Sequence, residues 1–256
     1  MIDIRGLYKS FEDKTVLSNI NASFENGKTN LIIGQSGSGK TVLMKCIVGL
    51  LTPEKGEVLY DGRNLVLMGK KEKKMLRKEM GMIFQSAALF DSMSVLDNVM
   101  FPLNMFSNDT LRDRTKRAMF CLERVNLTEA KDKFPGEISG GMQKRVAIAR
   151  AIALNPQYLF CDEPNSGLDP KTSLVIDELV HDITHEYNMT TLINTHDMNS
   201  VMGIGEKIIY IYDGYKEWEG SKDDIFTSSN KKLNDFIFAS DLFRKVKEVE
   251  VRNIEG

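Results

Sequence analysis

Residues 34–41 read "GQSGSGKT", and this stretch decides the fold class. It matches the pattern G-x-x-x-x-G-K-[ST] in full, in which glycines let the backbone curl until its N–H groups point at phosphate oxygens. Lys40 adds positive charge at the terminal phosphates, and Thr41 offers a hydroxyl to Mg²⁺. An apolar run at 30–33 precedes the stretch and another at 42–51 follows it, which indicates a strand–loop–helix. The stretch predicts a nucleoside triphosphate site, where the alternative is a flexible Gly/Ser loop.

Four short apolar runs, each ending in polar or glycine residues, indicate the strands of the main sheet. They occupy residues 30–34, 81–85, 158–163 and 191–196. Such runs, separated by helical stretches, are typical of buried strands in a largely parallel α/β sheet. Ligands of these sheets bind beyond the carboxyl ends of the strands. The residues expected to meet at that edge are Gly34, Gln85, Asp162, Glu163 and His196.

An acidic pair follows the third run, in "YLFCDE" at 158–163. Asp162 at the strand end can hold Mg²⁺, and Glu163 is placed to act as a general base toward an attacking water. Alone, such a pair is more often a plain strand end, and Gln85 after the second run is open to the same interpretation. The nucleotide-binding stretch upstream in the same chain favours the catalytic interpretation of the pair.

Two other regions frame these strands. Residues 1–30 alternate as strands do, with Asn26-Gly27 as a turn signal, and 56–62 is a further strand candidate, so we expect a small antiparallel layer. Residues 88–155 show a helical pattern and are assigned to a separate lobe. Residues 69–78, a basic run interrupted by a glutamate, are interpreted as a solvated helix face.

A second anion-binding pattern, "ISGGMQKR", occupies residues 138–145. Small residues stand before a helix whose apolar positions recur at steps of four and three, and the N-terminus of such a helix attracts anions. One chain therefore carries two phosphate-type cradles, Ser139-Gly140-Gly141 and residues 34–41.

Composition restricts the class of protein. The formal net charge of −2 over 256 residues argues against a broad nucleic-acid-binding surface. Three cysteines, each inside an apolar stretch, argue against a disulfide framework and for a reducing compartment. We see no signal-peptide pattern and no uninterrupted apolar stretch of membrane-spanning length. A membrane role would need another chain to supply the spanning part.

The motifs taken together, in this order along the chain, resemble the ATP-binding cassette (ABC) ATPase family. They are the 34–41 stretch, Gln85, "ISGGMQKR", "YLFCDEP", "SGLD" and "THD". The resemblance covers roughly residues 2–225 and implies an ABC-type P-loop NTPase with a mostly parallel central sheet, an antiparallel β subdomain and an inserted helical lobe. It places the ATPase domain at 1–239, with the lobe at about 88–155 and a C-terminal tail at 240–256.

The resemblance also implies roles for single residues. ATP is bound by Gly34, Gln35, Ser36, Gly37, Ser38, Gly39, Lys40 and Thr41, with Phe11 stacked on the adenine. Tyr8 competes with Phe11 for that role. Mg²⁺ is held by Thr41, Gln85 and Asp162, while Glu163, His196 and Gln85 serve catalysis.

Two copies are implied to pack head to tail, so that each ATP lies between the 34–41 loop of one chain and the signature of the other. Ser139, Gly140 and Gly141 then bind the γ-phosphate held by the partner copy, and Asp169 lies in the loop joining the two subunits. The signature departs from the commonest pattern at Ile138 and Met142, and Asn165 replaces the usual threonine or serine after "DEP".

The resemblance favours the ATP-hydrolysing motor subunit of a transporter over a soluble ABC ATPase acting on DNA or ribosomes. "SGGMQKRVAIARAIALNP" and "ALFDSMSVLDNVMFPL" resemble the bacterial Mla/Mce-type branch that moves phospholipids or related hydrophobic cargo. The alternative is an amino-acid or lipoprotein-release transporter. The implied partners are a second copy, a membrane permease and an Mce-type substrate-binding protein, without nucleic acid. The implied location is the cytoplasmic face of the inner (plasma) membrane.

Three further features are interpreted without the family. Apolar residues within 86–106 are expected to be mostly lobe core, with some of them lining a groove for a short permease helix. These residues include Leu89, Phe90, Met93, Val95, Val99 and Phe101, of which Leu89 and Phe90 are the positions to test. His181 and His185 have the i, i+4 spacing of a metal pair, but without a third evident ligand we interpret them as surface residues. Leu242, Val246 and Val249 form a helical stripe in the 240–256 tail.

Overall fold

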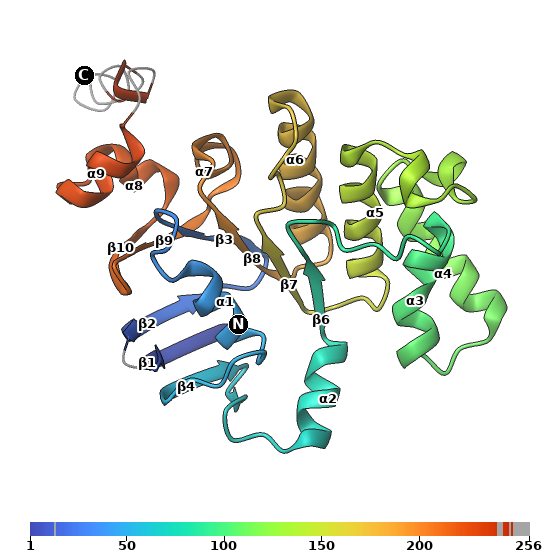
Figure 1. The fold of residues 1–256 in the computed structure, drawn as a ribbon, viewed down its shortest axis with the longest axis horizontal. Helices are drawn as coiled ribbons and strands as arrows, with labels where there is room; N and C mark the ends of the chain where they lie inside the picture. The colour runs from blue at the N-terminus through green and yellow to red at the C-terminus, as the bar shows by residue number, and fades with distance from the viewer. Residues whose placement is uncertain (13, 240–242, 246, 248–256) are drawn as a thin grey trace. The chain divides into compact units, whose positions relative to one another are not determined.

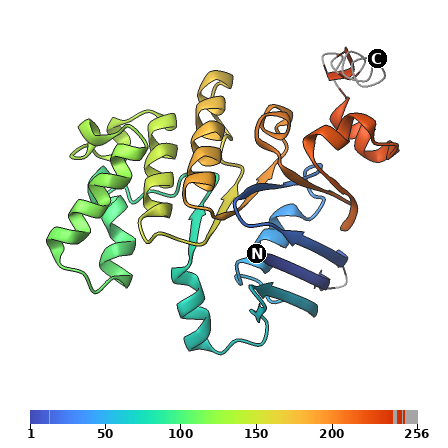
Figure 2. The ribbon, with the colours of Figure 1, turned by 180° about the vertical axis from the view of Figure 1, so that it is seen from behind.

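The computed structural model describes residues 1–12, 14–239, 243–245 and 247, and Figure 1 and Figure 2 draw its ribbon from two opposite sides. These residues form two compact units. Unit 1 comprises residues 1–25, 29–67 and the chain from Asn194 onward. Unit 2 comprises residues 26–28 and 68–193. The stripe expected at Leu242, Val246 and Val249 lies outside the described residues.

Unit 1 contains the predicted antiparallel layer. Its strands are β1 (Ile2–Phe11), β2 (Lys14–Phe24), β4 (Lys55–Tyr60) and β5 (Arg63–Asn64), in the order β2-β1-β4-β5. Ile2 faces Phe24 on one side and Tyr60 on the other, and all three side chains are fully buried. Alternation of buried and exposed residues therefore places one face of this layer on a core.

The nucleotide-binding stretch of unit 1 lies between a strand and a helix, as predicted. β3 (Lys28–Ile33), of which all but the first residue belongs to this unit, leads through residues 34–39 into α1 (Lys40–Ile47). β3 pairs in parallel with β9 (Lys207–Tyr212), and β9 pairs antiparallel with β10 (Tyr215–Gly220). Sequence analysis missed this last hairpin. The unit also contains the short helices α7 (Met198–Ile204), α8 (Lys222–Thr227) and α9 (Lys231–Ile237).

Unit 2 holds the other predicted strands. β6 (Met80–Ile83) pairs in parallel with β7 (Tyr158–Asp162), and the order continues to β8 (Thr190–Thr195), whose first four residues belong to this unit. α6 (Pro170–Glu186) connects β7 to β8. α2 (Lys70–Lys78) precedes β6 and buries only Leu76, which agrees with the solvated face expected there.

Three helices of unit 2 lie within the predicted lobe, residues 88–155. α3 (Val95–Phe106), α4 (Leu111–Arg124) and α5 (Gly140–Ile152) begin at side-chain caps, which are Ser94, Thr110 and Ser139. They pack on one another, and Figure 2 shows them side by side in green to yellow-green. Short 3₁₀ turns at Thr128–Ala130 and Pro135–Glu137 connect α4 to α5. The predicted α/β class, with parallel pairs, an antiparallel layer and a group of helices, is confirmed.

Glycine lets α5 approach the sheet of unit 2 closely. A Cβ atom on Gly81 of β6 would lie 2.5 Å from the carbonyl oxygen of Ala151, so any larger residue would push the helix away. Cys46, Cys121 and Cys161 are buried free thiols, as their apolar surroundings in the sequence predicted. Among the described residues, no helix is both long and apolar enough to cross a bilayer.

Candidate functional site

The loop at 34–39 in unit 1 forms a cradle of backbone. Gly34, Gly37 and Gly39 have φ of 152°, 80° and 108°, values that other residues rarely adopt. A Cβ on Gly34 would lie 2.2 Å from the carbonyl oxygen of Ile211, so only glycine fits there. The N-cap residue of α1 is Gly39, which has no side chain and therefore cannot accept a hydrogen bond from the N–H groups in the first turn of the helix. This is the geometry of an anion site at a helix N-terminus.

The polar side chains of this loop divide into buried and exposed groups. Lys40 is only 6% exposed, and its Nζ donates to the carbonyl oxygens of Gly34 at 2.7 Å and Gln35 at 3.0 Å. The Ser38 hydroxyl is buried without a hydrogen-bond partner among the described residues, so a polar ligand in the cradle would satisfy it. Gln35, Ser36 and Thr41 are exposed.

Two further predicted nucleotide contacts lie in unit 1. Phe11, at the end of β1, is 44% exposed, and the Lys9 ammonium lies 5.1 Å from its ring centroid. Tyr8 is 36% exposed, so both aromatic rings have a surface on which a base can stack. His196 follows β8 directly and is exposed, and the Asp197 N–H after it donates to the Thr195 hydroxyl at 3.0 Å.

The acidic pair of unit 2 lies where β7 ends. Asp162 is the last residue of that strand, and Glu163 adopts a left-handed conformation with φ of 48° that turns the chain away from it. Asn165 donates from Nδ2 to a carboxylate oxygen of Asp177 at 2.6 Å, and Asp177 is only 4% exposed. Asn165, which differs from the usual threonine or serine of the family, therefore links the turn after β7 to α6.

Gln85 lies two residues beyond β6, and the structure brings it to the loop that follows Glu163. Its Nε2 donates to the Ser166 hydroxyl at 3.0 Å, and the Ser166 N–H donates to the Glu163 carbonyl oxygen at 3.1 Å. Within unit 2, Gln85 is therefore linked to Glu163 through Ser166, whereas a direct meeting of the strand-end residues stays a prediction. Sequence analysis did not identify Ser166 as a partner, because the two residues are 81 positions apart.

The second cradle lies at the start of α5. The Ser139 Oγ accepts a hydrogen bond from the Met142 N–H at 3.3 Å, and Ser139 and Gly140 are exposed. A Cβ on Gly141 would lie 2.6 Å from Cγ2 of Thr172, so glycine is needed for the close approach of α5 to α6. These three residues and Asp169 line one pocket of about 490 Å³, together with Arg145 and Lys171. The pocket suits an anion, because it combines a helix N-terminus with two cations.

Asp169, which lines this pocket, is the N-cap residue of α6. Its Oδ1 accepts from the Thr172 N–H at 3.0 Å and its Oδ2 from the Thr172 hydroxyl at 2.5 Å. These hydrogen bonds to the carboxylate lower the pKa of Asp169 from its ordinary value. Asp169 is therefore a stable anion that orders the start of α6.

A groove of about 360 Å³ lies on unit 2 beside β6 and α3. Its apolar lining includes Met82, Phe84, Phe90, Phe101 and Phe106. The rings of Phe90 and Phe101 lie 4.6 Å apart between centroids, whereas Val95 and Val99 are fully buried in the core. Of the apolar residues expected within 86–106, Phe90 and Phe101 line this groove, whereas Leu89 is half-buried and is not part of its lining. The permease contact stays a prediction.

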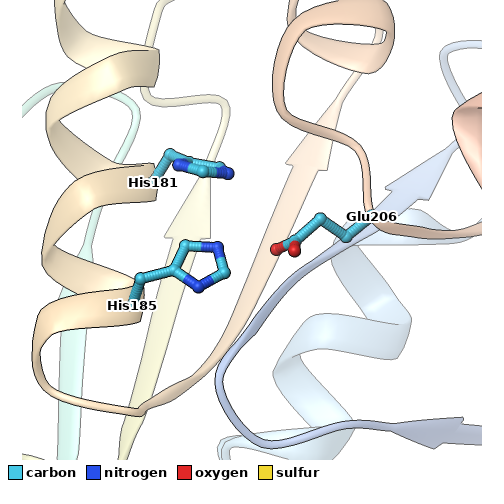
Figure 3. Close-up of side chains that lie close together, drawn as sticks. All are labelled: His181, His185 and Glu206. Atoms are coloured by element: carbon cyan, nitrogen blue, oxygen red, sulfur yellow. The ribbon is translucent and has the colours of Figure 1, made fainter.

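Two histidines lie on α6 of unit 2. Figure 3 shows His181 and His185 one turn apart, with ring centroids at 4.4 Å. His185 is exposed and His181 half-buried, as expected of residues on a helix surface. Figure 3 also draws Glu206, a residue of unit 1 whose carboxylate accepts from the N–H of Thr29 at 2.8 Å and from its hydroxyl at 3.0 Å.

Comparisons with known proteins identify the family of this chain. The sequence profile described as "ABC transporter" matches residues 17–166. The chain is 35% identical over 236 residues to the probable ribonucleotide transport ATP-binding protein mkl of Mycobacterium leprae, covering 92% of this chain and 68% of that protein. It is 36% identical to the intermembrane phospholipid transport system ATP-binding protein MlaF of Haemophilus influenzae, covering 93% and 90%. It is 38% identical to the methionine import ATP-binding protein MetN of Clostridioides difficile, covering 93% and 74%.

The fold is also shared with solved structures. One is the dimeric, post-hydrolysis ATP-binding cassette MJ0796 bound to ADP and Pi, with a TM-score of 0.78 and 33% identity over 87% of this chain and 99% of that chain. The family profile covers more than half of the chain, and the match to MlaF spans nearly all of both proteins. The chain therefore belongs to the ABC transporter family of ATP-binding, ATP-hydrolysing cassettes.

Proposed function

We propose that this ABC ATPase works as a pair of identical copies that drive a separate membrane permease, with phospholipid or another hydrophobic envelope molecule as cargo. The observation that carries the proposal is the pairing of two anion cradles of different construction in one chain, one at Gly34–Thr41 and one at Ser139–Gly141. ATP bound between two copies uses both cradles at once. The dimeric cassette among the solved relatives supports this arrangement.

The first cradle holds the triphosphate. Backbone N–H groups of the 34–39 loop and the start of α1 donate to phosphate oxygens, and Lys40 exchanges its two carbonyl partners for the terminal phosphates. Phe11 supplies the stacking surface for adenine, with Tyr8 as the competing ring.

Mg²⁺ fits the residues expected to hold it. Thr41, Gln85 and Asp162 offer a hydroxyl, an amide carbonyl and a carboxylate, which are the oxygen donors that this ion prefers. Two features of the loop support a bound polar group: the Ser38 hydroxyl lacks a hydrogen-bond partner within the described part of the chain, and the backbone at Gly34 leaves no room for a Cβ. Bound with ATP, Mg²⁺ would neutralise charge on the phosphate oxygens.

Hydrolysis is assigned to residues at the strand ends. Glu163 accepts a proton from the attacking water, an effect typically worth ~10²–10⁴ in rate. Gln85 orients that water and senses the γ-phosphate, and His196 donates to the γ-phosphate. In the partner copy, Ser139 and the N–H groups of Gly140 and Gly141 close over the same phosphate.

The cargo assignment is supported by the likeness to MlaF, whose name describes phospholipid transport and which matches over 90% of its own length. A second candidate is amino-acid import, because the methionine import protein MetN is 38% identical over a stretch of the same length. We assign the permease contact to the groove at Phe90, and we propose the cytoplasmic face of the plasma membrane as the location of the chain. An Mce-type binding protein would complete a lipid system.

A photocrosslinking experiment tests the partner and the branch together. Phe90 is replaced by the photoreactive p-benzoyl-phenylalanine in cells of the source organism, and the crosslinked membrane protein is identified by mass spectrometry. Phe120 on α4 is the matched control, because it is 39% exposed against 40% for Phe90 and also has an arginine over its ring. We expect a permease crosslinked from Phe90 only, copurifying with an Mce-domain protein and phospholipid.

Other outcomes contradict separate parts of the proposal. A permease that copurifies with an amino-acid-binding protein would favour the second candidate. Equal crosslinking from Phe120, or none from Phe90, would contradict the groove as the permease site.

A further inference from the structure

The loop that follows Gln85 is held in an unfavourable backbone conformation. Ala87 and Ala88 have φ of 60° and 48°, and two consecutive left-handed residues with a Cβ are seldom found. Such a conformation persists only where the surrounding structure fixes it.

One arginine of α5 fixes this pair. The guanidinium of Arg150 donates from Nη2 to the carbonyl oxygen of Ala87 and from Nη1 to that of Ala88, both at 2.8 Å. Burial lowers the pKa of Arg150, but a guanidinium stays protonated at any working pH. Its planar fork suits two neighbouring carbonyl groups in a way that a lysine ammonium cannot reproduce.

A lysine of the same helix fixes Gln85 itself. Lys144 is only 5% exposed, and its Nζ donates to the backbone carbonyl oxygen of Gln85. Burial lowers the pKa of Lys144, and the nearby Glu163 carboxylate acts in the opposite direction. Burying an ammonium group without a hydrogen-bond partner costs free energy. The contact with the Gln85 carbonyl oxygen therefore stabilises both the loop and α5.

The far end of the loop is pinned independently. The fully buried amide of Asn98 accepts from the Phe90 N–H at 2.9 Å and donates to the carbonyl oxygens of Phe90, Met93 and Ser94. Residues 90–94 are therefore fixed by α3, whereas residues 85–88 are fixed by α5.

We propose that Lys144 and Arg150 are positioning residues for hydrolysis, which hold the carbonyls of Gln85, Ala87 and Ala88 so that the Gln85 amide lies against the loop following Glu163. The 3.0 Å contact of Gln85 with Ser166 is the geometry that they maintain. The inference rests on the proposed catalytic role of Gln85. Both side chains donate to backbone carbonyls of the loop, and neither is among the residues assigned to ATP, so substitutions at either should lower turnover and leave ATP affinity unchanged.

The chain offers a matched control for Arg150. Arg117 on α4 also donates to two consecutive carbonyl oxygens, those of Ile152 at 2.8 Å and Ala153 at 3.0 Å, at the C-terminal end of α5. Arg150→Met and Arg117→Met therefore remove the same kind of contact from the same helix. Only Arg150→Met should lower kcat, by about tenfold to a hundredfold, as a misplaced catalytic group does.

Four measurements accompany these variants: kcat at saturating ATP, the Kd for ATP, the melting temperature, and amide hydrogen exchange of residues 85–90. We expect Arg150→Met to raise exchange in that segment while Kd stays within about twofold, a change that corresponds to less than ~0.5 kcal/mol. Lys144→Met should also lower kcat, and Lys144→Arg, which keeps a donor, should restore most of it. If Arg150→Met does not fold, Arg150→Lys replaces it in the experiment. Arg150→Lys should also lower kcat, because a lysine ammonium reaches only one of the two carbonyl oxygens.

A double-mutant cycle separates this inference from the role of Gln85. In a Gln85→Ala background, Arg150→Met should lower kcat no further. A normal kcat in Gln85→Ala would overturn the role of Gln85 and the inference with it. A reduced kcat in Gln85→Ala with a normal kcat in Arg150→Met and Lys144→Met would overturn the inference alone. Full additivity of the two losses would also overturn it.

Discussion

Helices α1 and α5 both begin beside glycine, yet they begin in different ways. The N-cap of α1 is Gly39, which lies in the left-handed region and makes no side-chain cap. The N-cap of α5 is Ser139, which is extended and caps the Met142 N–H with its own hydroxyl. One helix start leaves its donors to a ligand, and the other uses a side chain of its own.

The difference indicates a division of labour between the two cradles. An uncapped start beside a buried lysine is built to surround phosphates, because its N–H groups are satisfied by whatever enters. A capped, exposed start keeps its shape without a ligand and can be presented to a phosphate held elsewhere. This comparison predicts that α1 binds ATP first and that α5 completes the site across the dimer.

The strongest test asks whether the two helix starts serve one ATP from different copies. We expect a Lys40→Ala copy paired with a Ser139→Arg copy to retain one intact site. A copy carrying both changes, paired with wild type, should retain none. Vanadate trapping of nucleotide in purified heterodimers measures this beside turnover, since coupling between sites can silence hydrolysis. Trapping in the second pairing and none in the first would break the comparison.

Stopping the chemical step sharpens the comparison further. Glu163→Gln should lower kcat by ~10²–10⁴ while ATP binding persists, because the amide cannot take the proton from water. The ATP-bound dimer should then accumulate, as followed by size-exclusion chromatography with light scattering. Adding Ser139→Arg should abolish that dimer without changing the affinity of the monomer for ATP. Near-normal turnover in Glu163→Gln would reject the role of Glu163 as the base.

Replacing a glycine by alanine should change the free energy of unfolding more at the loop before α1 than at the start of α5. Gly34→Ala should lower the free energy of unfolding by ~2 kcal/mol or more, because its φ and the 2.2 Å approach to the Ile211 carbonyl exclude a Cβ. Gly140→Ala should change it by less than ~0.5 kcal/mol, because its Cβ would lie 3.8 Å from Leu168. Urea unfolding of both variants gives the comparison. Equal losses of unfolding free energy in the two variants would mean that the loop before α1 has no greater need of glycine than the start of α5.

The cap of α5 can be separated from its contact with phosphate. Ser139→Ala should lower the free energy of unfolding by ~1 kcal/mol, since the Met142 N–H loses its acceptor. Ser139→Asp should keep the cap and wild-type stability, yet lose hydrolysis by repelling the γ-phosphate. Thermal unfolding and ATPase assays on both variants decide this. Full activity in Ser139→Asp would remove Ser139 from the site.

The smallest expected effect lies in the alkaline pH dependence of the two helices. Burial raises the pKa of Cys46 in α1 to about 11 from 9.0, so its stabilisation is complete below pH 9 and is lost as pH rises to 11. Burial lowers the pKa of Lys144 in α5 below 10.5, so stability is gained as pH rises through that folded value. Cys46→Ala should reduce the alkaline loss, and Lys144→Met should increase it. Urea midpoints measured from pH 8 to 11 check both signs.

The sequence predicted the parts of this molecule that depend on local pattern. The 34–41 loop and the strands at 30–34 and 158–163 follow from glycine spacing and apolar runs, and the structure has them at those places. The hairpin of β9 and β10 was missed, although Asp213-Gly214, which directly follows the apolar run KIIYIY, is a turn signal.

The remaining parts of the site depend on contacts that no local pattern records. Lys144 meets the Gln85 carbonyl across 59 positions of sequence, and Arg150 meets Ala87 across 63. Both acceptors are backbone carbonyl oxygens, which every residue has. The sequence therefore does not indicate which residue Lys144 or Arg150 contacts. The anion pocket formed by Asp169 and Ser139 likewise depends on the packing of α6 against α5.

Arg150 also lines the groove, where its guanidinium lies 5.9 Å from the ring centroid of Phe90. One side chain thus contributes both to the groove that we propose as the permease site and to the contacts that we propose position Gln85 for hydrolysis. Adapting the groove to a different permease, by natural divergence or by engineering, would also change how fast the protein consumes ATP at rest. A chimaera with a transplanted groove should therefore inherit the idle turnover of its donor along with the donor's partner.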